Sequence, residues 1–480
     1  MKKFIFAAMG VAIIFASSCK KDISRSDDQK PLIIGATVDT LRGEITVNTT
    51  VTKTTYLQGM VYVKPGVTLT INAGITIKGS PGGVAPDTVD LTNNKGTLIV
   101  EMGGKLVANG TATSPIVFTS NAAPGSRNYG DWGGIVLFGK APIKTTTGAT
   151  TNTYEAFAAS DARNIYGGTD PADNSGSMTY CRIEFGGGVV LKPNQEVNGL
   201  TLCGVGTGTT VHHIEVSNSG DDGYEFFGGR VNAHHLLSFG NKDDDYDFDE
   251  AYQGNLQFII AYRNDLADNS GSEIVELDNN ASASDFFPGT NHTTPTIVNA
   301  TFIGPHSTVV RPGSGGRFDG CVYVRRSGRI RLANSLIISD SLPTALALTP
   351  TTRNAVDNIS PATPDHSFIR YNLFQTYSTH PVIWDNDEGN PIVDGTATAD
   401  PDNLLIGELG NGTQLNSALA TPADFKLDAF LKPLAGSPAL SGGVALNGLD
   451  PFFVGTTQRG AVTTSDPWTS TGTWISIATN

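Results

Sequence analysis

Two stretches of the chain carry nearly the same acidic phrase, "NSGDDGYEFFGG" at 218–229 and "NKDDDYDFDEAY" at 241–252. A shift of 22 residues aligns them. The shift superimposes Asp221 on Asp243, Asp222 on Asp244, Tyr224 on Tyr246, Glu225 on Asp247, Phe226 on Phe248, and His212 and His213 on His234 and His235. A fixed short period is the signature of a repeat architecture, in which each unit packs on its neighbours.

The length of the repeat predicts the fold. A weaker third copy follows, with Asp265 and Asp268 in the same register. A coil of this length, at about 3.3 Å per extended residue, has a contour of roughly 70 Å, which three strands and three turns close into a triangle. Coils stacked about 4.8 Å apart share one core. We therefore predict an all-β chain folded as a right-handed parallel β-helix.

The composition agrees with strands and tight turns. The chain has 480 residues, 55 of them glycine, and short Val-, Ile- and Thr-rich runs recur at 60–79, 96–120 and 131–143. A leucine-rich repeat would need spaced leucines and a helical segment, which are missing. A β-propeller would need a period of about 40 residues. A pair of β-sandwiches would leave the repeat unexplained.

The N-terminus reads as a secretory signal over 1–18. Two lysines precede an apolar run at 4–15, which is too short to span a bilayer, and small residues then precede Cys19. This "ASSC" ending resembles a bacterial lipoprotein signal, which implies lipid on Cys19. The alternative is an ordinary cleaved signal with an incidental thiol. Residues 19–42 resemble the charged tether of lipoproteins exported to the outer surface of Gram-negative cells, or form a solvated linker.

The net charge limits the classes of binding partner, and the cysteine spacing bears on disulfide formation. The formal net charge of −14 makes nucleic acid a poor partner and divalent cations good ones. Cys181 and Cys203 are one repeat apart, which leaves a disulfide between them open, but their local alternation disagrees, so buried free thiols are the simpler interpretation for the cysteines after Cys19, including Cys321. The oligomeric state is left open.

Longer motifs resemble a family of bacterial surface and secreted β-helix proteins. The stretches are "LIVEMGGKLVANGTATSPIVFTS", "GDWGGIVLFGKAPI", "NGLTLCGVGTGTTVHHIEVSNSGDDGYEFFGG" and "DPWTSTGTW". The resemblance implies a right-handed β-helix and lipid anchoring in an outer membrane, and says little about activity. We place the β-helix at 43–450 with inserted loops, and a segment capping its open end at 451–480.

The repeated acids raise an electrostatic problem. Two charges about 4.8 Å apart repel by roughly 1 kcal/mol in water and about 3.5 kcal/mol at an effective dielectric of 20. Calcium would relieve this repulsion, since it takes 6–8 oxygens in irregular geometry. The spacing does not fit an EF-hand, so any site would be built from stacked coils. The candidate ligands are Asp221, Asp222, Glu225, Asp243, Asp244, Asp245, Asp247 and Asp249. Asp245, Asp247 and Asp249 occupy alternate positions, so a strand would place all three on one face.

Two other interpretations of the acids remain open. One is a solvated edge that suppresses strand pairing with other chains. The other is a catalytic carboxylate set, as in polygalacturonase-type glycosidases, although two of that group's motifs are absent. A β-helix polysaccharide lyase would add a basic arginine or lysine, for which "VYVRRSGRIR" at 322–331 offers Arg325, Arg326, Arg329 and Arg331. Of these, Arg325 and Arg329 are the candidate ligand-binding residues.

Aromatic and imidazole side chains are the remaining candidates. Trp132 could stack on a sugar, although a packed tryptophan is the simpler interpretation. With Ile214 inside, alternation predicts His212 inside and His213 outside, as stacked packing rather than metal ligands.

These observations favour a calcium-stabilised glycan-binding or adhesion protein on the cell surface, anchored in the outer membrane by its lipid. No catalytic residue is assigned, and the incomplete catalytic sets weigh against an enzyme. The alternatives are a polysaccharide lyase or glycoside hydrolase acting at the acids, and a structural protein of the cell envelope.

Overall fold

The computed structural model describes residues 40–82, 94–192, 195–263, 271–279, 291–305, 320–339, 341–342, 344–349, 352, 367–376, 382–384 and 415–477. Residues 31–480 form one compact unit. Cys19, the signal at 1–18, and Asp265 and Asp268 lie outside the described residues. Within the described part, no helix is long and apolar enough to cross a membrane.

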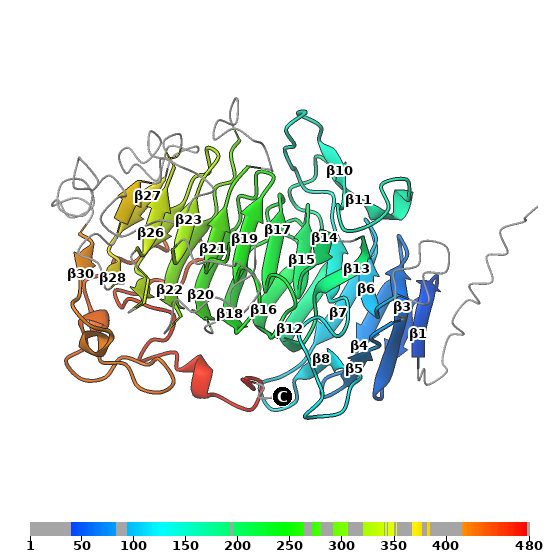
Figure 1. The fold of residues 1–480 in the computed structure, drawn as a ribbon, viewed down its shortest axis with the longest axis horizontal. Helices are drawn as coiled ribbons and strands as arrows, with labels where there is room; N and C mark the ends of the chain where they lie inside the picture. The colour runs from blue at the N-terminus through cyan, green and yellow to red at the C-terminus, as the bar shows by residue number, and fades with distance from the viewer. Residues whose placement is uncertain are drawn as a thin grey trace, which may run out of the picture. The chain divides into compact units, whose positions relative to one another are not determined.

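Parallel strands stack in three columns and build a right-handed parallel β-helix, as predicted (Figure 1). The first column contains β2 (Thr49–Val51), β4 (Thr68–Ile71), β7 (Lys105–Asn109), the first parts of β12 (Gly176–Glu184), β16 (Thr210–Ser217), β18 (Ala233–Phe239), β20 (Asn255–Tyr262) and β22 (Thr296–Ile303), then β24 (Arg331–Ala333) and β27 (Phe368–Arg370). The second column contains the first parts of β1 (Thr40–Ile45) and β3 (Thr55–Val63), then β5 (Thr76–Gly79), β8 (Ile116–Ser120), the second parts of β12, β16, β18, β20 and β22, then β25 (Leu336–Ile338), β28 (Leu373–Gln375) and β30 (Ser417–Ala418).

The third column carries the acidic repeat. It contains the second parts of β1 and β3, then β6 (Thr97–Val100), β9 (Ile135–Phe138), β15 (Leu200–Cys203), β17 (Tyr224–Phe227), β19 (Tyr246–Asp249), β21 (Val275–Leu277), β23 (Val322–Val324), β26 (Leu346–Leu348) and β29 (Val382–Trp384). The first strand begins at Thr40, inside the stretch predicted as tether.

The predicted register is observed between successive coils. Tyr224 pairs with Tyr246 and Glu225 with Asp247. The two tyrosine rings stack inside the helix, with centroids 5.0 Å apart and 11° between their planes. Such stacked apolar and aromatic side chains form one core that runs through the coils.

A left-handed residue separates the first column from the second. His213 and His235 stand at this corner with φ of 54° and 56°, and strand pairing skips His213. The corner interrupts the strand alternation, so Val211 and Ile214 both enter the core. His212 is half-buried and lies beside His213 instead of entering the core, so the prediction that it points inward is wrong.

In the described residues, two antiparallel hairpins interrupt the coils: β10 (Thr151–Thr153) with β11 (Ile165–Gly167), and β13 (Gly188–Lys192) with β14 (Gln195–Val197). Short 3₁₀ turns occur at η2 (Ala162–Asn164), η3 (Pro422–Phe425), η4 (Pro438–Leu440) and η5 (Trp468–Ser470). The first hairpin rises beside the third column (Figure 1).

The C-terminal strap, which we define as residues 451–477, runs along the side of the β-helix (Figure 1). Val454 exchanges hydrogen bonds with Gln257, Asp466 contacts His235, and the backbone of Thr473 bonds that of Ala112. These partners belong to widely separated coils. The predicted cap over an open end is therefore corrected to a lateral strap, whose aromatic side chains cover the corner between the first two columns.

Candidate functional site

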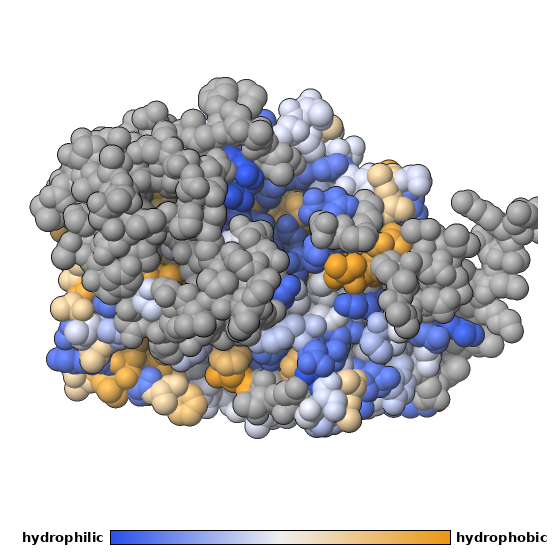
Figure 2. All heavy atoms as spheres, viewed as in Figure 1, coloured by the Kyte–Doolittle hydropathy of each residue, from blue (hydrophilic) through white to orange (hydrophobic). Residues whose placement is uncertain are grey.

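An acidic pocket opens beside the third column, with a volume of about 210 Å³. Nine of its eleven lining residues carry carboxyl groups, and none of the described lining residues is basic. Figure 2 shows hydrophilic residues gathered in a hollow over the region of β14, β17 and β19. The lining residues are Glu155, Gln195, Glu196, Asn198, Asp221, Asp222, Glu225, Asp243, Asp244, Asp247 and Glu276.

The floor of the pocket follows from strand alternation. Tyr224 and Phe226 enter the core, so Glu225 between them faces outward. The ladder places Asp247 opposite Glu225, and Glu276 opposite Asp247. Three successive coils therefore present one carboxylate each at the same position. The β10–β11 insertion contributes Glu155, and β14 contributes Glu196.

The aspartates before each strand also hold the backbone of the next coil. Asp222 Oδ1 accepts the backbone N–H of Asp244 at 2.9 Å, and Asp244 Oδ1 accepts the N–H of Glu273 at 2.5 Å. Asp243 Oδ1 accepts the hydroxyl of Ser272 at 3.0 Å. Part of the acidic repeat thus connects coil to coil, a role that the sequence analysis did not consider.

Asn198 brings a further oxygen atom that can ligate a cation, and the sequence did not predict it. Its side chain is 1% exposed, and its Nδ2 donates to Glu225 Oε2 and to Thr201 Oγ1 at 3.4 Å. Within the described part of the chain, its Oδ1 has no hydrogen-bond partner. A buried carbonyl oxygen without a donor is costly, and a bound cation would satisfy it.

The carboxylates are poorly accommodated as anions. Burial, and then the charge of Asp221, raises the pKa of Asp222 well above its usual value. Burial also raises the pKa of Glu225 and of Asp247 well above the usual range, and neighbouring carboxylates add to both shifts. Such groups either keep a proton or require a cation.

Three groups of acids bring carboxylate oxygens within 4.8 Å of one another: Asp221, Asp222 and Asp243; Asp222, Glu225 and Asp247; and Asp244, Glu273 and Glu276. Six of the eight predicted ligands therefore lie around one pocket: Asp221, Asp222, Glu225, Asp243, Asp244 and Asp247. Hard oxygen donors in this number and irregular arrangement suit Ca²⁺.

The other two predicted ligands lie elsewhere. Asp245 is fully buried, where its Oδ1 accepts the Ser238 hydroxyl at 2.6 Å and its Oδ2 lies 3.5 Å from an Arg263 nitrogen. Because Asp245 precedes β19, it does not share the outward face of Asp247. Asp249 follows in the strand opposite Phe227, and its carboxylate accepts the N–H of Glu250.

Of the two arginines predicted to bind ligand, one lies at the acidic pocket and the other does not. Arg325 contacts the pocket residue Glu276 and lies 3.3 Å from Asp278, so it stands at the edge of the acidic pocket. The guanidinium of Arg329 instead donates to the backbone oxygens of Ser327 and Gly328.

Trp132 cannot form a sugar platform. It is fully buried in the core, and its Nε1 donates to the carbonyl oxygen of Glu184 at 2.8 Å. A Cβ at Gly79 would lie 2.4 Å from Trp132, so the glycine leaves room for the indole. The three cysteines among the described residues are buried and free: Cys181, Cys203 and Cys321.

The fold and the pocket define a parallel β-helix protein with a concentrated acidic site on one column. Residues 43–380 match the family described as the pectate-lyase like beta helix domain. The chain belongs to this family. No curated protein and no solved structure matched the chain.

Proposed function

We propose that this protein binds a glycan at the cell surface, through calcium held in the acidic pocket. One observation carries the proposal: nine carboxyl-bearing residues converge on one small pocket with Asn198, whose Oδ1 has no hydrogen-bond partner among the described residues. Calcium would neutralise the like charges and give Asn198 a partner, since it accepts carboxylate and carbonyl oxygens together.

The family supports a carbohydrate-related role for this pocket. The third column is a long, regular surface, and the insertion that carries Glu155 forms a wall beside it. A uronic-acid carboxylate could complete the coordination of a pocket calcium, while a neutral glycan would use its hydroxyls. We therefore favour an acidic polysaccharide as the ligand. Anchoring through lipid on Cys19, facing outward from the outer membrane, completes the proposal.

A polysaccharide lyase is the second candidate, and Arg325 favours it. An arginine beside calcium-binding acids is the combination that such an enzyme would require. However, Arg325 contacts both Glu276 and Asp278. This arrangement suits charge balance and ligand binding better than proton abstraction, so binding without turnover is the first proposal.

The test is calorimetric titration of residues 31–480 with Ca²⁺, then with polygalacturonate in the presence and absence of Ca²⁺. We expect calcium binding, and polysaccharide binding only with calcium. Glu225→Gln combined with Asp247→Asn should abolish both. Asp170→Asn, which removes an exposed carboxylate outside the pocket, is the matched control. Failure to bind calcium would refute the proposal, and release of unsaturated products would establish the lyase instead.

A further inference from the structure

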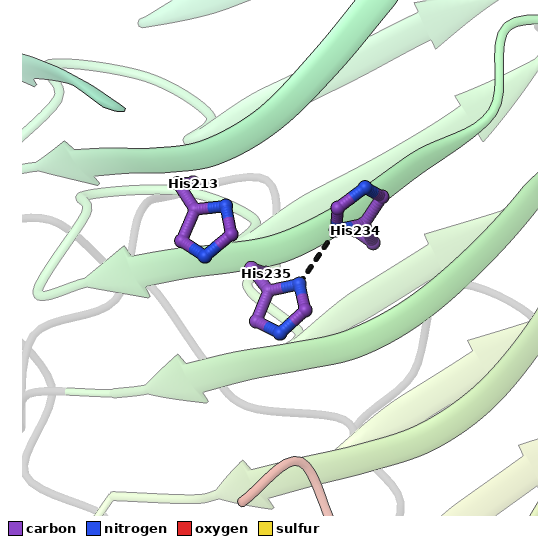
Figure 3. A group of neighbouring side chains, drawn as sticks. All are labelled: His213, His234 and His235. Atoms are coloured by element: carbon purple, nitrogen blue, oxygen red, sulfur yellow. Dashed lines mark hydrogen bonds between the residues drawn. The ribbon is translucent and has the colours of Figure 1, made fainter. Parts of the chain in front are cut away.

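Four histidines gather at the corner between the first two columns, and we call them the histidine stack: His212, His213, His234 and His235. His212 stacks on His234 with ring centroids 4.8 Å apart, and His213 stacks on His235 at 4.3 Å. Within each coil the two rings meet through their Nδ1 atoms, at 2.9 Å in one pair and 2.6 Å in the other. Figure 3 shows three of these rings side by side, with the contact from His234 to His235.

A contact from the C-terminal strap determines the proton positions on His235. Its Nε2 lies 2.8 Å from Asp466 Oδ2. A carboxylate only accepts, so Nε2 carries a proton, and in the neutral form of the ring Nδ1 then carries a lone pair. That Nδ1 faces Nδ1 of His234. A carboxylate on the far nitrogen is the outer-sphere arrangement that orients a metal-binding histidine.

Two tryptophans of the C-terminal strap pack against the histidine stack. Trp468 lies edge-on to His235, and Trp474 contacts His213, with centroid distances of 5.2 and 5.4 Å. Burial, and then the neighbouring His235, lowers the pKa of His213 to about 2 and that of His234 to about 3. The Nδ1 atoms of each pair face one another within this aromatic surround, and this geometry carries the ligand assignment.

We propose that His213, His234 and His235 bind one divalent transition-metal ion of the Zn²⁺ class, with Asp466 holding the ring of His235 from behind. One nitrogen from each ring lies within 4.8 Å of the others. Zinc–nitrogen bonds of about 2.0–2.1 Å place tetrahedral ligands roughly 3.4 Å apart. Side-chain rotation must therefore open the close His234–His235 contact and bring His213 nearer.

The ligand chemistry separates this site from the acidic pocket. Imidazole nitrogen suits Zn²⁺, Cu²⁺ and Ni²⁺, whereas the all-oxygen pocket suits Ca²⁺. His212 Nδ1, 2.9 Å from His213 Nδ1, or a water molecule would supply a fourth ligand. Because Asp466 belongs to the C-terminal strap, a bound ion would join two adjacent coils and orient the strap across them.

The test starts from purified, chelator-treated protein in excess Ca²⁺, which keeps Zn²⁺ from the acidic pocket. We expect calorimetry to show one tight Zn²⁺ equivalent, and Co²⁺ in its place to give the visible absorption of a tetrahedral nitrogen site. The Glu225→Gln/Asp247→Asn protein should retain this equivalent, so the result does not depend on the proposed function of the acidic pocket.

Three variants decide the assignment. His234→Gln with His235→Gln should abolish tight binding, and His292→Gln, outside the cluster, should leave it unchanged. Asp466→Asn keeps the ligands and should weaken Zn²⁺ affinity by about 10- to 100-fold. Asp466 is 43% exposed, so this variant should fold even if the double histidine variant does not. Absence of the Zn²⁺ equivalent, or equal affinity in the Asp466→Asn protein, would overturn the proposal.

Discussion

The acidic pocket and the histidine stack come from the same repeat, yet they place opposite demands on the protein. In both, the repeat stacks like side chains on adjacent coils: Glu225 on Asp247, and His213 on His235. Neutral aromatic rings gain from stacking at this spacing, while carboxylates repel. The histidine stack is therefore stable as it stands, and the acidic pocket requires a cation or protons. A repeat fixes where side chains meet, but their chemistry decides whether the meeting stabilises the fold.

The largest effect is expected where the C-terminal strap covers the histidine stack. Trp474 is 1% exposed and stacks on Trp468 at 5.7 Å. Trp474→Ala should lower the free energy of unfolding by about 3–5 kcal/mol, as for other buried tryptophans. Denaturant unfolding measures this loss. A matched replacement of exposed Phe430 by alanine should have little effect, and equal losses in the two variants would contradict the role of Trp474.

The acidic pocket should respond in the opposite direction. In metal-free protein at pH 8, Glu225→Gln with Asp247→Asn should stabilise the fold by up to about 3 kcal/mol, because the substitutions remove a repulsion of that order. The same variant should lose any stabilisation by Ca²⁺. Chemical unfolding with and without chelator measures both effects. Destabilisation of the metal-free protein would show that the two carboxylates are compensated without a cation.

A third pair of variants separates the two roles of the repeated aspartates. Asp222→Ala leaves the buried N–H of Asp244 without its acceptor and should cost about 1–3 kcal/mol, while Asp222→Asn keeps an acceptor oxygen and should cost less. Both substitutions remove the charge from the pocket, so both should weaken calcium binding. Equal stability of the two proteins, measured by thermal unfolding in chelator, would argue against the coil-to-coil hydrogen bond.

Much of the fold could be predicted because the coil period is written in the sequence. The 22-residue shift correctly placed Tyr224 on Tyr246 and Glu225 on Asp247. Strand alternation failed for His212, since a left-handed residue at His213 interrupts the strand without a glycine to mark it. It also failed for Asp245, which lies before the strand and turns to Ser238 and Arg263.

The candidate site could be predicted only in part, because the repeat reveals residues on adjacent coils but not residues from distant segments. Local spacing grouped six acids, but Asn198 and Glu155 reach the pocket from other segments of the chain. Asn198 stands two residues before a short apolar strand, where asparagine is common in turns, and nothing near it in the sequence points to the pocket. The contact of Asp466 with His235 joins residues 231 positions apart, so no local pattern could predict it.

The acidic pocket and the histidine stack should change the stability of the fold in opposite directions as the pH changes. The net change in stability should be the smallest of the effects predicted here. The folded-state pKa values of Asp222, Glu225 and Asp247 are raised, so the stability they contribute is present below about pH 4 and is lost as the pH rises. The folded-state pKa values of His213 and His234 are lowered to about 2 and about 3, so their contribution is present above about pH 6.5 and is lost as the pH falls. In metal-free protein these trends partly cancel between pH 4 and 6.5.

The Glu225→Gln/Asp247→Asn variant removes part of the carboxylate contribution. Its stability should therefore rise as the pH rises from 4 to 7, whereas the wild-type profile should be flatter. Unfolding midpoints across this range measure the difference, and parallel profiles would mean that the pocket carboxylates do not carry the shifted pKa values.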